Sequence, residues 1–444
     1  MRGKSLNRVG SIVGGVALGV ALALAPLGVH AADSDADKVA ALEKKLDESL
    51  KRIDALAARV KELEAKQAGA PARAAAAAPA QAAPPAEAAR IEAVEQKVAQ
   101  IETANATRRQ DDTGLPVHGF ADVGAGNHNP YTPDLKGFNV GNLDFYLTPR
   151  LGERALALFE LNFEVGTDGA VGVDLERAQI GYQFSDQATV WLGRFHTPYG
   201  YVNTALHHGA WLSNSLRRPK FLAFEDQGGS LPAHTVGAWL SGSEHAGSGK
   251  LLYDLYVGNG QEIEDGTLDM RNAGNDHGST IFGGRAGYQF GSGLLDGLTV
   301  GVHALSSRVE DNGITPNVTR INVTGGYAVY DTDDWEAMTE LYLFNNEDLS
   351  TGTGHHRSEA GFAQVGYRAS WGVPYVRYER GAFKQADHYF FDQLTGNSYY
   401  RGALGVRFDL DVKAALKFEF ATTHDTDRVV QEYNEALVQY AIRF

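Results

Sequence analysis

The stretch from Tyr201 to about Ala233 carries several ionisable side chains and separates two apolar, alternating segments. The groups on this stretch that can attract or repel an ion are bases or histidines followed by acids, namely His207, His208, Arg217, Arg218, Lys220, Glu225 and Asp226. Opposed charges in a narrow passage create a transverse field that sorts solutes by charge and size. The alternative is a plain exterior loop whose charges are solvated.

Adjacent histidines occur at His207–His208 and again at His355–His356. Imidazole nitrogens bind transition metals, but neither pair has a carboxylate or cysteine at ligand spacing. We therefore predict solvated loop histidines, no metal and no cofactor. A glycine-rich phosphate loop, GxSxG and HExxH are absent, which argues against an enzyme. A catalytic pair assembled only in space stays an alternative.

Composition limits the compartment and the partners. The chain has 444 residues, no cysteine, 51 glycines, 19 tyrosines, 20 phenylalanines and a net charge of −15, and the acidic balance argues against nucleic acid as a partner. Residues 1–31 have a basic head, an apolar run and small residues before a plausible cut, which is typical of a secretory signal. No later stretch has the ~20 apolar residues of a spanning helix.

Two heptad patterns follow the signal segment. In residues 34–67, Val39, Leu46, Ile53 and Val60 recur every seventh position, which predicts a coiled coil. A single solvated helix is the alternative. Residues 68–89 form an Ala/Pro-rich linker, and a short second coiled-coil segment is predicted at 90–104.

From residue 115 to 444 the pattern changes to glycine, aromatics and period-two alternation, which predicts strands. We expect about sixteen strands of some ten to fourteen residues, the length of tilted membrane-spanning strands. Their expected ranges are 117–126, 138–150, 155–166, 171–184, 188–198, 234–243, 250–259, 278–290, 298–309, 318–330, 334–345, 357–369, 373–383, 398–409, 414–424 and 433–444.

The connections between these strands alternate in length. Turns such as "SDQ", "SWG" and "LDVK" alternate with longer polar segments, as in outer-membrane barrels with their long loops outside. A soluble sandwich has no reason to alternate in this way. The predicted fold is therefore an all-β transmembrane barrel of about sixteen antiparallel strands, preceded by an α-helical coiled coil.

Strand parity assigns a face to each charged side chain. Because charge facing lipid costs about 2–4 kcal/mol at mid-membrane, charged residues should face the lumen. The predicted lumen residues are Arg177, Arg285, Arg377, Arg401, Arg407, Lys417, Glu419 and Arg443, together with Glu160 and Glu164. Wall bases favour anions, but the same arginines paired with these glutamates would only brace the barrel. Both interpretations stay open.

Aromatic side chains mark the strand ends that precede short turns. Tyr182 and Phe184, Tyr288 and Phe290, and the terminal Phe444 occupy equivalent places, which predicts a girdle at one membrane interface. Phe444 also resembles the C-terminal aromatic signature by which bacterial outer-membrane proteins are recognised for insertion.

The segment "WLGRFHTPYGYVN" resembles the G-R-F/x-x-P-F/Y-G segment at the end of the fifth strand in the phosphate-selective porin superfamily; the matching residues are Gly193, Arg194, Phe195, Pro198, Tyr199 and Gly200. The resemblance covers roughly Val117 to Phe444. Members of that superfamily are homotrimers of sixteen-strand channels, and some members have an N-terminal coiled coil. The resemblance therefore implies a homotrimer here, and in porins the loop after strand five commonly folds inward. The arginine ladder and lysine cluster of phosphate selectivity have no counterpart, so the substrate does not carry over.

The sequence thus predicts an outer-membrane porin that passes small hydrophilic solutes or ions, with a preference for anions. It would sit among the lipids of a Gram-negative outer membrane, with its coiled coil in the periplasm. One alternative is a structural barrel that is anchored to the periplasm or sheathes a partner protein. A catalytic barrel is the third hypothesis.

Overall fold

The structure is a computed structural model that describes residues 117–127, 136–149, 151–165, 169–207, 210–269, 278–311, 316–391, 393–427 and 432–444. The predicted signal segment (1–31), coiled coil (34–67), linker (68–89) and second coiled-coil segment (90–104) lie outside these residues. Among the described residues, no helix has the length and apolarity needed to cross a membrane.

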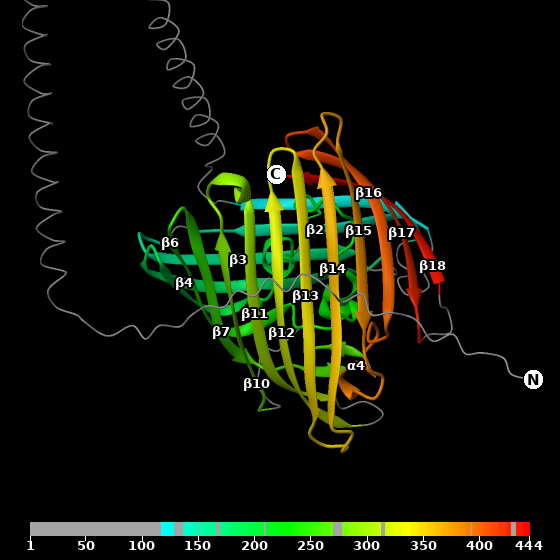
Figure 1. Cartoon of the computed structure of the whole chain (residues 1–444). Coiled ribbons are helices and arrows are strands. Elements are labelled where there is room, and N and C mark those ends of the chain that lie inside the picture. The colour runs from blue at the N-terminus through cyan, green and yellow to red at the C-terminus, as the bar shows by residue number, and fades with distance from the viewer. Residues whose placement is uncertain are drawn as a thin grey trace, which may run out of the picture. The chain divides into compact units, whose positions relative to one another are not determined.

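In the described residues, sixteen antiparallel strands form one closed wall, as the sequence predicts (Figure 1). They are β1 (Val117–Gly126), β2 (Gly137–Leu147), β3 (Ala155–Val165), β4 (Val171–Ser185), β5 (Ala188–His196), β6 (His234–Ala246), β7 (Gly249–Asn259), β10 (Thr280–Gln289), β11 (Leu298–Asp311), β12 (Asn317–Asp331), β13 (Trp335–Asp348), β14 (His355–Tyr367), β15 (Val373–Ala382), β16 (Tyr399–Asp411), β17 (Ala414–Asp425) and β18 (Glu432–Arg443). Each strand pairs with its sequence neighbours, and β1 pairs with β18 to close the wall. Closure leaves no unpaired strand edge.

Short elements lie in the connections. The segment between β5 and β6 contains α3 (Val202–Ala205), η2 (Lys220–Leu222) and η3 (Glu225–Gln227). The segment between β7 and β10 contains β8 (Glu262–Glu264) and β9 (Thr267–Leu268), and two other connections contain η4 (Gly293–Leu295) and α4 (His388–Phe391). The turns at the end that carries the C terminus are short, whereas most loops at the other end are longer (Figure 1).

The hairpin of β13 and β14 extends further than the sequence predicts. β13 continues to Asp348 and β14 begins at His355, so the second histidine pair lies on a strand rather than in a loop. The Asp348 carboxylate accepts hydrogen bonds from the backbone N–H groups of Ser350 (2.9 Å) and Thr351 (2.8 Å), which stabilises a tight turn. A compact turn lets the flanking strands pair almost to their ends.

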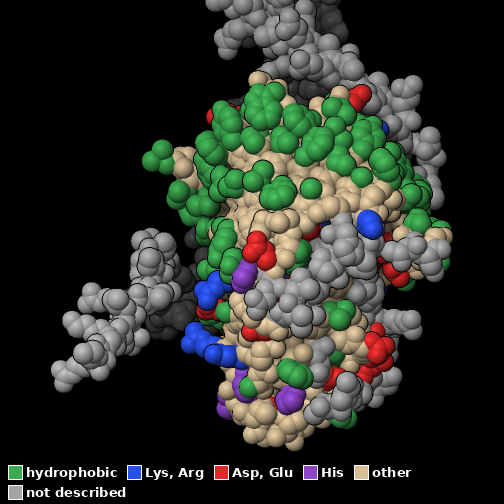
Figure 2. Space-filling view, turned by 90° about the vertical axis from the view of Figure 1, so that its right-hand side faces the viewer, with side chains coloured by type: hydrophobic (Ala, Val, Ile, Leu, Met, Phe, Trp, Pro, Cys, Tyr) green, Lys and Arg blue, Asp and Glu red, His purple; other side chains and the backbone are tan. Residues whose placement is uncertain are grey.

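The outer face of the wall is apolar because one parity of each strand points away from the lumen. On β16, β17 and β18 the exposed side chains include Tyr400, Leu404, Phe418, Phe420 and Tyr440. Figure 2 shows apolar side chains gathered over the upper part of one face, whereas the histidines lie in the lower part. Such an apolar band is the surface that a bilayer requires.

The terminal residue takes part in closing the barrel. The backbone N–H of Phe444 donates to the Gly119 carbonyl (3.0 Å), and Gly119 donates back to the Phe444 carbonyl (3.1 Å). A Cβ atom on Gly119 would lie 2.3 Å from the Phe444 ring, so the ring packs directly over this glycine. It also contacts Phe145, with ring centres 5.7 Å apart. The terminal aromatic therefore stabilises the seam between the first and last strands.

The main buried apolar cluster lies on the inner side of the wall. Phe221 from the segment between β5 and β6 packs edge-on against Tyr342 of β13, with ring centres 5.2 Å apart. Its backbone N–H donates to the Tyr399 hydroxyl of β16 (3.1 Å). Both contacts require this segment to lie inside the barrel, because inward-facing side chains of distant strands reach it.

Candidate functional site

The segment between β5 and β6, residues 197–233, is called the inner loop below. Three wall carboxylates accept hydrogen bonds from its backbone N–H groups: Glu340 from Tyr201 (2.8 Å) and Val202 (2.7 Å), Glu379 from Lys220 (2.7 Å), and Glu419 from Leu216 (3.1 Å). Glu340, Glu379 and Glu419 belong to β13, β15 and β17. Acceptors on one side of the barrel thus hold a loop that starts and ends on the other side, so the loop crosses the lumen.

Wall bases hold the carbonyl groups of the same loop. Arg285 of β10 donates to the Gly200 carbonyl (2.7 Å), and Arg377 of β15 donates to the Arg217 carbonyl (2.7 Å). A buried carbonyl without a partner would cost about 1–3 kcal/mol. These two arginines therefore fix the path of the inner loop in addition to lining the lumen.

Arg407 and Lys417 have a similar role near the short-turn end. Arg407 donates to the Trp211 carbonyl, and its guanidinium carbon lies 4.6 Å from the centre of the Trp211 ring. Lys417 donates to the carbonyls of Ala210 and Ser213. Both side chains face inward, at the parity that the sequence predicts, and they anchor the loop there.

Wall carboxylates neutralise most of the wall bases. Arg177 pairs with Glu160, Arg285 with Asp254 (2.6 Å), Arg377 with Glu379 (2.8 Å), Arg401 with Glu435 (2.5 Å) and Glu419 (3.2 Å), and Arg407 with Asp409 (2.8 Å). Arg443 is exposed, and its guanidinium carbon lies 5.2 Å from the centre of the Trp211 ring. The wall arginines could either attract anions or pair with carboxylates to brace the barrel. These distances favour bracing for the wall arginines.

The three bases of the inner loop differ in their surroundings. Arg217 pairs with Glu435 (3.4 Å) and its side chain is 23 % exposed, while Lys220 pairs with Asp425 and is 12 % exposed. Arg218 instead donates to the carbonyls of Leu222 (2.6 Å) and His207 (3.1 Å) within the loop, and burial lowers its pKa. Arg218 is therefore a loop-organising residue, whereas Arg217 and Lys220 reach water.

A cavity of about 780 Å³ lies between the inner loop and the inner wall. Among the described residues that line it, six are bases: Lys136, Arg217, Arg218, Lys220, Arg377 and Arg401. Three are acids: Asp122, Glu164 and Glu435. The surface of this passage is thus more basic than the chain as a whole, whose net charge is −15.

The prediction that the acids of this loop face its bases across the channel is wrong for Glu225. This carboxylate is fully buried and accepts a hydrogen bond from the backbone N–H of His234 (2.8 Å), so it does not face the cavity. The side chain of Asp226 and the whole of His208 lie outside the described residues. The acids that oppose the loop bases are on the wall instead, at Glu435 and Asp425.

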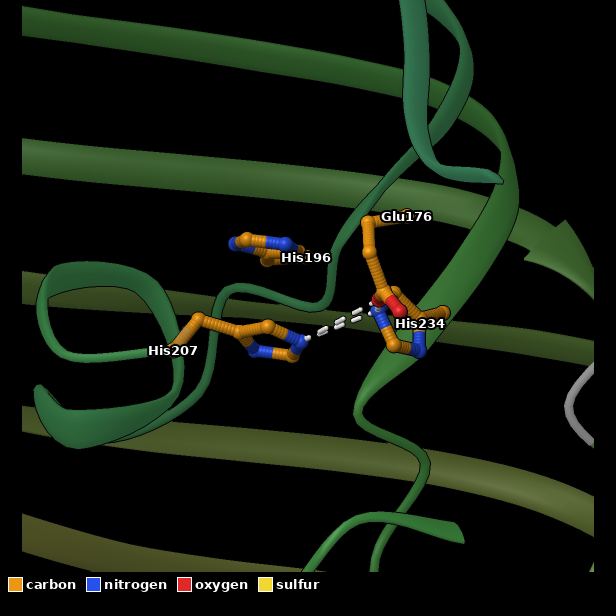
Figure 3. A group of neighbouring side chains, drawn as sticks. All are labelled: Glu176, His196, His207 and His234. Atoms are coloured by element: carbon orange, nitrogen blue, oxygen red, sulfur yellow. Dashed lines mark hydrogen bonds and ion pairs between the residues drawn. The ribbon is translucent and has the colours of Figure 1, made fainter. Parts of the chain in front are cut away.

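The prediction of a solvated histidine at position 207 is also wrong. His207 is buried, and it lies in a cluster with Glu176, His196 and His234 whose potential ligand atoms are all within 4.8 Å of one another (Figure 3). The His207 and His234 Nε2 atoms are 2.9 Å apart, and Glu176 Oε2 is 2.6 Å from His234 Nε2. His196 stacks on His207, with ring centres 3.5 Å apart.

Glu176 reaches this cluster because β4 contains a bulge. The pairing of β3 with β4 changes register between Glu160 and Leu161, which oppose Arg177 and Leu175 and leave Glu176 as the extra residue. A bulge re-aims side chains, and here both Glu176 and Arg177 face inward. The sequence of β4 contains a sign of this bulge. Its apolar residues have odd numbers up to Leu175 and even numbers from Ile180 onward, so the outward-facing parity changes between these two residues.

No family model matches the sequence, and no curated protein matches it. Solved structures are similar over the barrel. The anion-selective porin from Comamonas acidovorans is 15 % identical, with a TM-score of 0.50, over 74 % of this chain and 98 % of that chain. The trimer form of OmpT, an outer membrane protein of Vibrio cholerae, is 13 % identical, with a TM-score of 0.50, over 74 % and 99 %. The chain has the porin fold.

Within the porin fold, the motif "GRFHTPYG" forms the passage from β5 into the inner loop. Gly193 has φ +120°, and a Cβ atom there would lie 2.0 Å from the Ala178 carbonyl oxygen of the neighbouring strand, so only glycine fits. Gly200 has φ +53°, and a Cβ atom would clash with the Glu340 carboxylate. Gly193 thus allows β4 and β5 to approach closely within the wall, and Gly200 allows the chain to turn inward at the start of the inner loop.

Proposed function

We propose that this protein is an outer-membrane porin, a water-filled channel through which small hydrophilic solutes or ions diffuse, with a preference for anions. The observation that carries the proposal is the inner loop, which wall residues hold across the lumen beside a cavity lined by more bases than acids. A loop in this position would narrow the channel, and the cavity beside it would form part of the remaining path. Nothing in this arrangement requires a catalytic step, so the proposal is a channel rather than an enzyme.

The proposal places the barrel in the outer membrane of a Gram-negative bacterium and its heptad segments in the periplasm. The apolar outer face supports membrane insertion, and one solved structure with the same fold is a trimer form. The chain would assemble as a homotrimer, with residues 34–67 and 90–104 forming coiled coils and residues 68–89 serving as the spacer. Residues 1–31 would be removed as a signal peptide.

The preference for anions rests on the two loop bases that reach water. Arg217 and Lys220 pair with buried carboxylates, but their side chains are partly exposed while those carboxylates are 2 % and 0 % exposed. An ion in the cavity therefore meets the cationic ends first. Screening over such distances is incomplete, because the Debye length is about 10 Å in 0.1 M salt and about 30 Å in 0.01 M salt.

The test is the reversal potential of single channels in planar bilayers across a salt gradient. The double variant Arg217→Gln with Lys220→Gln should shift the reversal potential towards cations, and the shift should be larger in dilute salt. The control is Arg308→Gln with Arg320→Gln, two exposed arginines of β11 and β12 that are paired with Glu310 and Glu347. Equal reversal potentials for the two double variants would contradict a selective role for the loop bases.

The same recordings test the channel itself. An open porin should pass a steady current in the absence of any other protein. If the inserted barrel passes almost no current, the structural alternative is favoured, in which the barrel is a periplasm-linked anchor or sheathes a partner protein. Insertion is verified separately by the heat-dependent change in gel migration that folded barrels show.

A further inference from the structure

We propose that Glu176, His196, His207 and His234 form a binding site for a divalent transition metal ion of the zinc class, which fastens the base of the inner loop to the barrel wall. The four residues come from β4, the end of β5, the inner loop and the start of β6 (Figure 3). They bring three imidazoles and one carboxylate together. All four are at least 95 % buried.

Three of the four ligand atoms already lie near the separations of a tetrahedral metal site. Zinc bonds of about 2.0–2.1 Å in a tetrahedral site place neighbouring ligand atoms about 3.3 Å apart. The His207 Nε2 to His234 Nε2 distance is 2.9 Å, and Glu176 Oε2 lies 2.6 Å from His234 Nε2 and 3.8 Å from His207 Nε2. These three separations bracket the required value. His196, whose ring stacks on His207 with ring centres 3.5 Å apart, must turn to direct a nitrogen at the same ion.

Outer contacts orient two of the imidazoles for metal binding. His207 Nδ1 lies 2.9 Å from the Asn203 carbonyl, and His234 Nδ1 lies 3.1 Å from Glu225 Oε2. A hydrogen on each Nδ1 satisfies these acceptors and leaves the Nε2 lone pairs directed at the cluster. Metal-binding histidines commonly have such a carboxylate or carbonyl partner. Glu225 therefore has a positioning role, which explains its burial away from the cavity.

The set of donors selects the kind of ion. Three imidazoles and one carboxylate suit Zn²⁺ and the neighbouring ions Co²⁺, Ni²⁺ and Cu²⁺, whereas Ca²⁺ and Mg²⁺ require oxygen ligands. Four protein ligands close a tetrahedral site, which is typical of structural rather than catalytic zinc. The expected consequence of binding is therefore mechanical: the inner loop is held in a single position beside the wall.

The experiment uses the tag-free full chain, purified in detergent, stripped with a chelator and dialysed against Zn²⁺ or Co²⁺ alone. We expect one Zn²⁺ per chain, and with Co²⁺ the intense visible absorption of a four-coordinate site. The variants Glu176→Gln and His207→Asn should lose both signals. The control His355→Asn removes an exposed histidine of β14 and should retain them.

The variant Glu225→Gln distinguishes a metal site from a merely structural cluster. It leaves all four ligands in place, but its amide is a poorer partner for His234 Nδ1, so Zn²⁺ binding should weaken by about 10–100-fold. Unchanged gel migration would show that the barrel remains folded. The proposal is overturned if the unaltered protein binds no Zn²⁺, if Glu176→Gln binds it equally well, or if His355→Asn loses as much binding.

Discussion

Replacement of Arg401 by leucine should strongly destabilise the barrel, because this guanidinium is shared by three buried carboxylates. Its nitrogens lie 2.5 Å from Glu435, 3.2 Å from Glu419 and 3.6 Å from Glu379, and the Arg401 side chain is 6 % exposed. Removing one partner of a buried ion pair typically costs about 3–5 kcal/mol. Arg377 lies 2.8 Å from Glu379 and 4.0 Å from Glu419 and offsets part of the loss, so we expect about 3 kcal/mol.

The matched control is Arg380→Leu on the neighbouring strand. Arg380 pairs with Glu359 at 3.5 Å, but the two side chains are 61 % and 57 % exposed, and an exposed pair contributes about 0–1 kcal/mol. The assay is equilibrium unfolding of the refolded barrel in guanidinium, followed by tryptophan fluorescence. Adding Glu435→Gln to Arg401→Leu should restore part of the lost stability, because the buried Glu435 carboxylate would otherwise keep only its longer contact with Arg217 (3.4 Å). Equal unfolding midpoints for Arg401→Leu and Arg380→Leu would refute the reasoning.

Two further changes address insertion and assembly. Phe444→Ser should cost only about 1–3 kcal/mol of folded stability, because the ring is already 43 % exposed, yet it should lower the amount inserted in cells. Outer-membrane levels equal to those of the parent, measured by quantitative immunoblotting of membrane fractions, would contradict this. Deletion of residues 34–104 should weaken self-association but leave a heat-modifiable, membrane-inserted barrel. Failure of the truncated chain to insert would show that the domain division is wrong.

Strand positions were readable from the sequence because they depend on local alternation. Membrane-facing and lumen-facing side chains have opposite polarity, so every second residue records its own environment. Val438, Tyr440 and Ile442 are apolar for this reason, and they lie opposite Ala125, Val123 and Ala121 where the barrel closes. The motif around Gly193 was also local, since one backbone position there excludes any side chain.

The cluster around His207 was not readable from the sequence. Its four side chains come from four segments, and a bulge in β4 lets both Glu176 and Arg177 face inward. Parity counted back from the predicted lumen residue Arg177 would place Glu176 on the lipid side. A pairwise pattern such as His207–His208 carries no information about which distant residues approach it.

By itself, the sequence determined the class of fold, the positions of the strands and the inward face of wall bases such as Arg285, Arg377 and Arg401, because each follows from the polarity of neighbouring residues. Only the tertiary structure decided what those charges do. Arg401 forms ion pairs with three carboxylates on other strands. Arg377 and Lys417 donate hydrogen bonds to carbonyls of the inner loop. Glu225 contacts His234 and does not face the cavity. Charge pairing depends on distance in space, which closure of the barrel and the path of the inner loop determine.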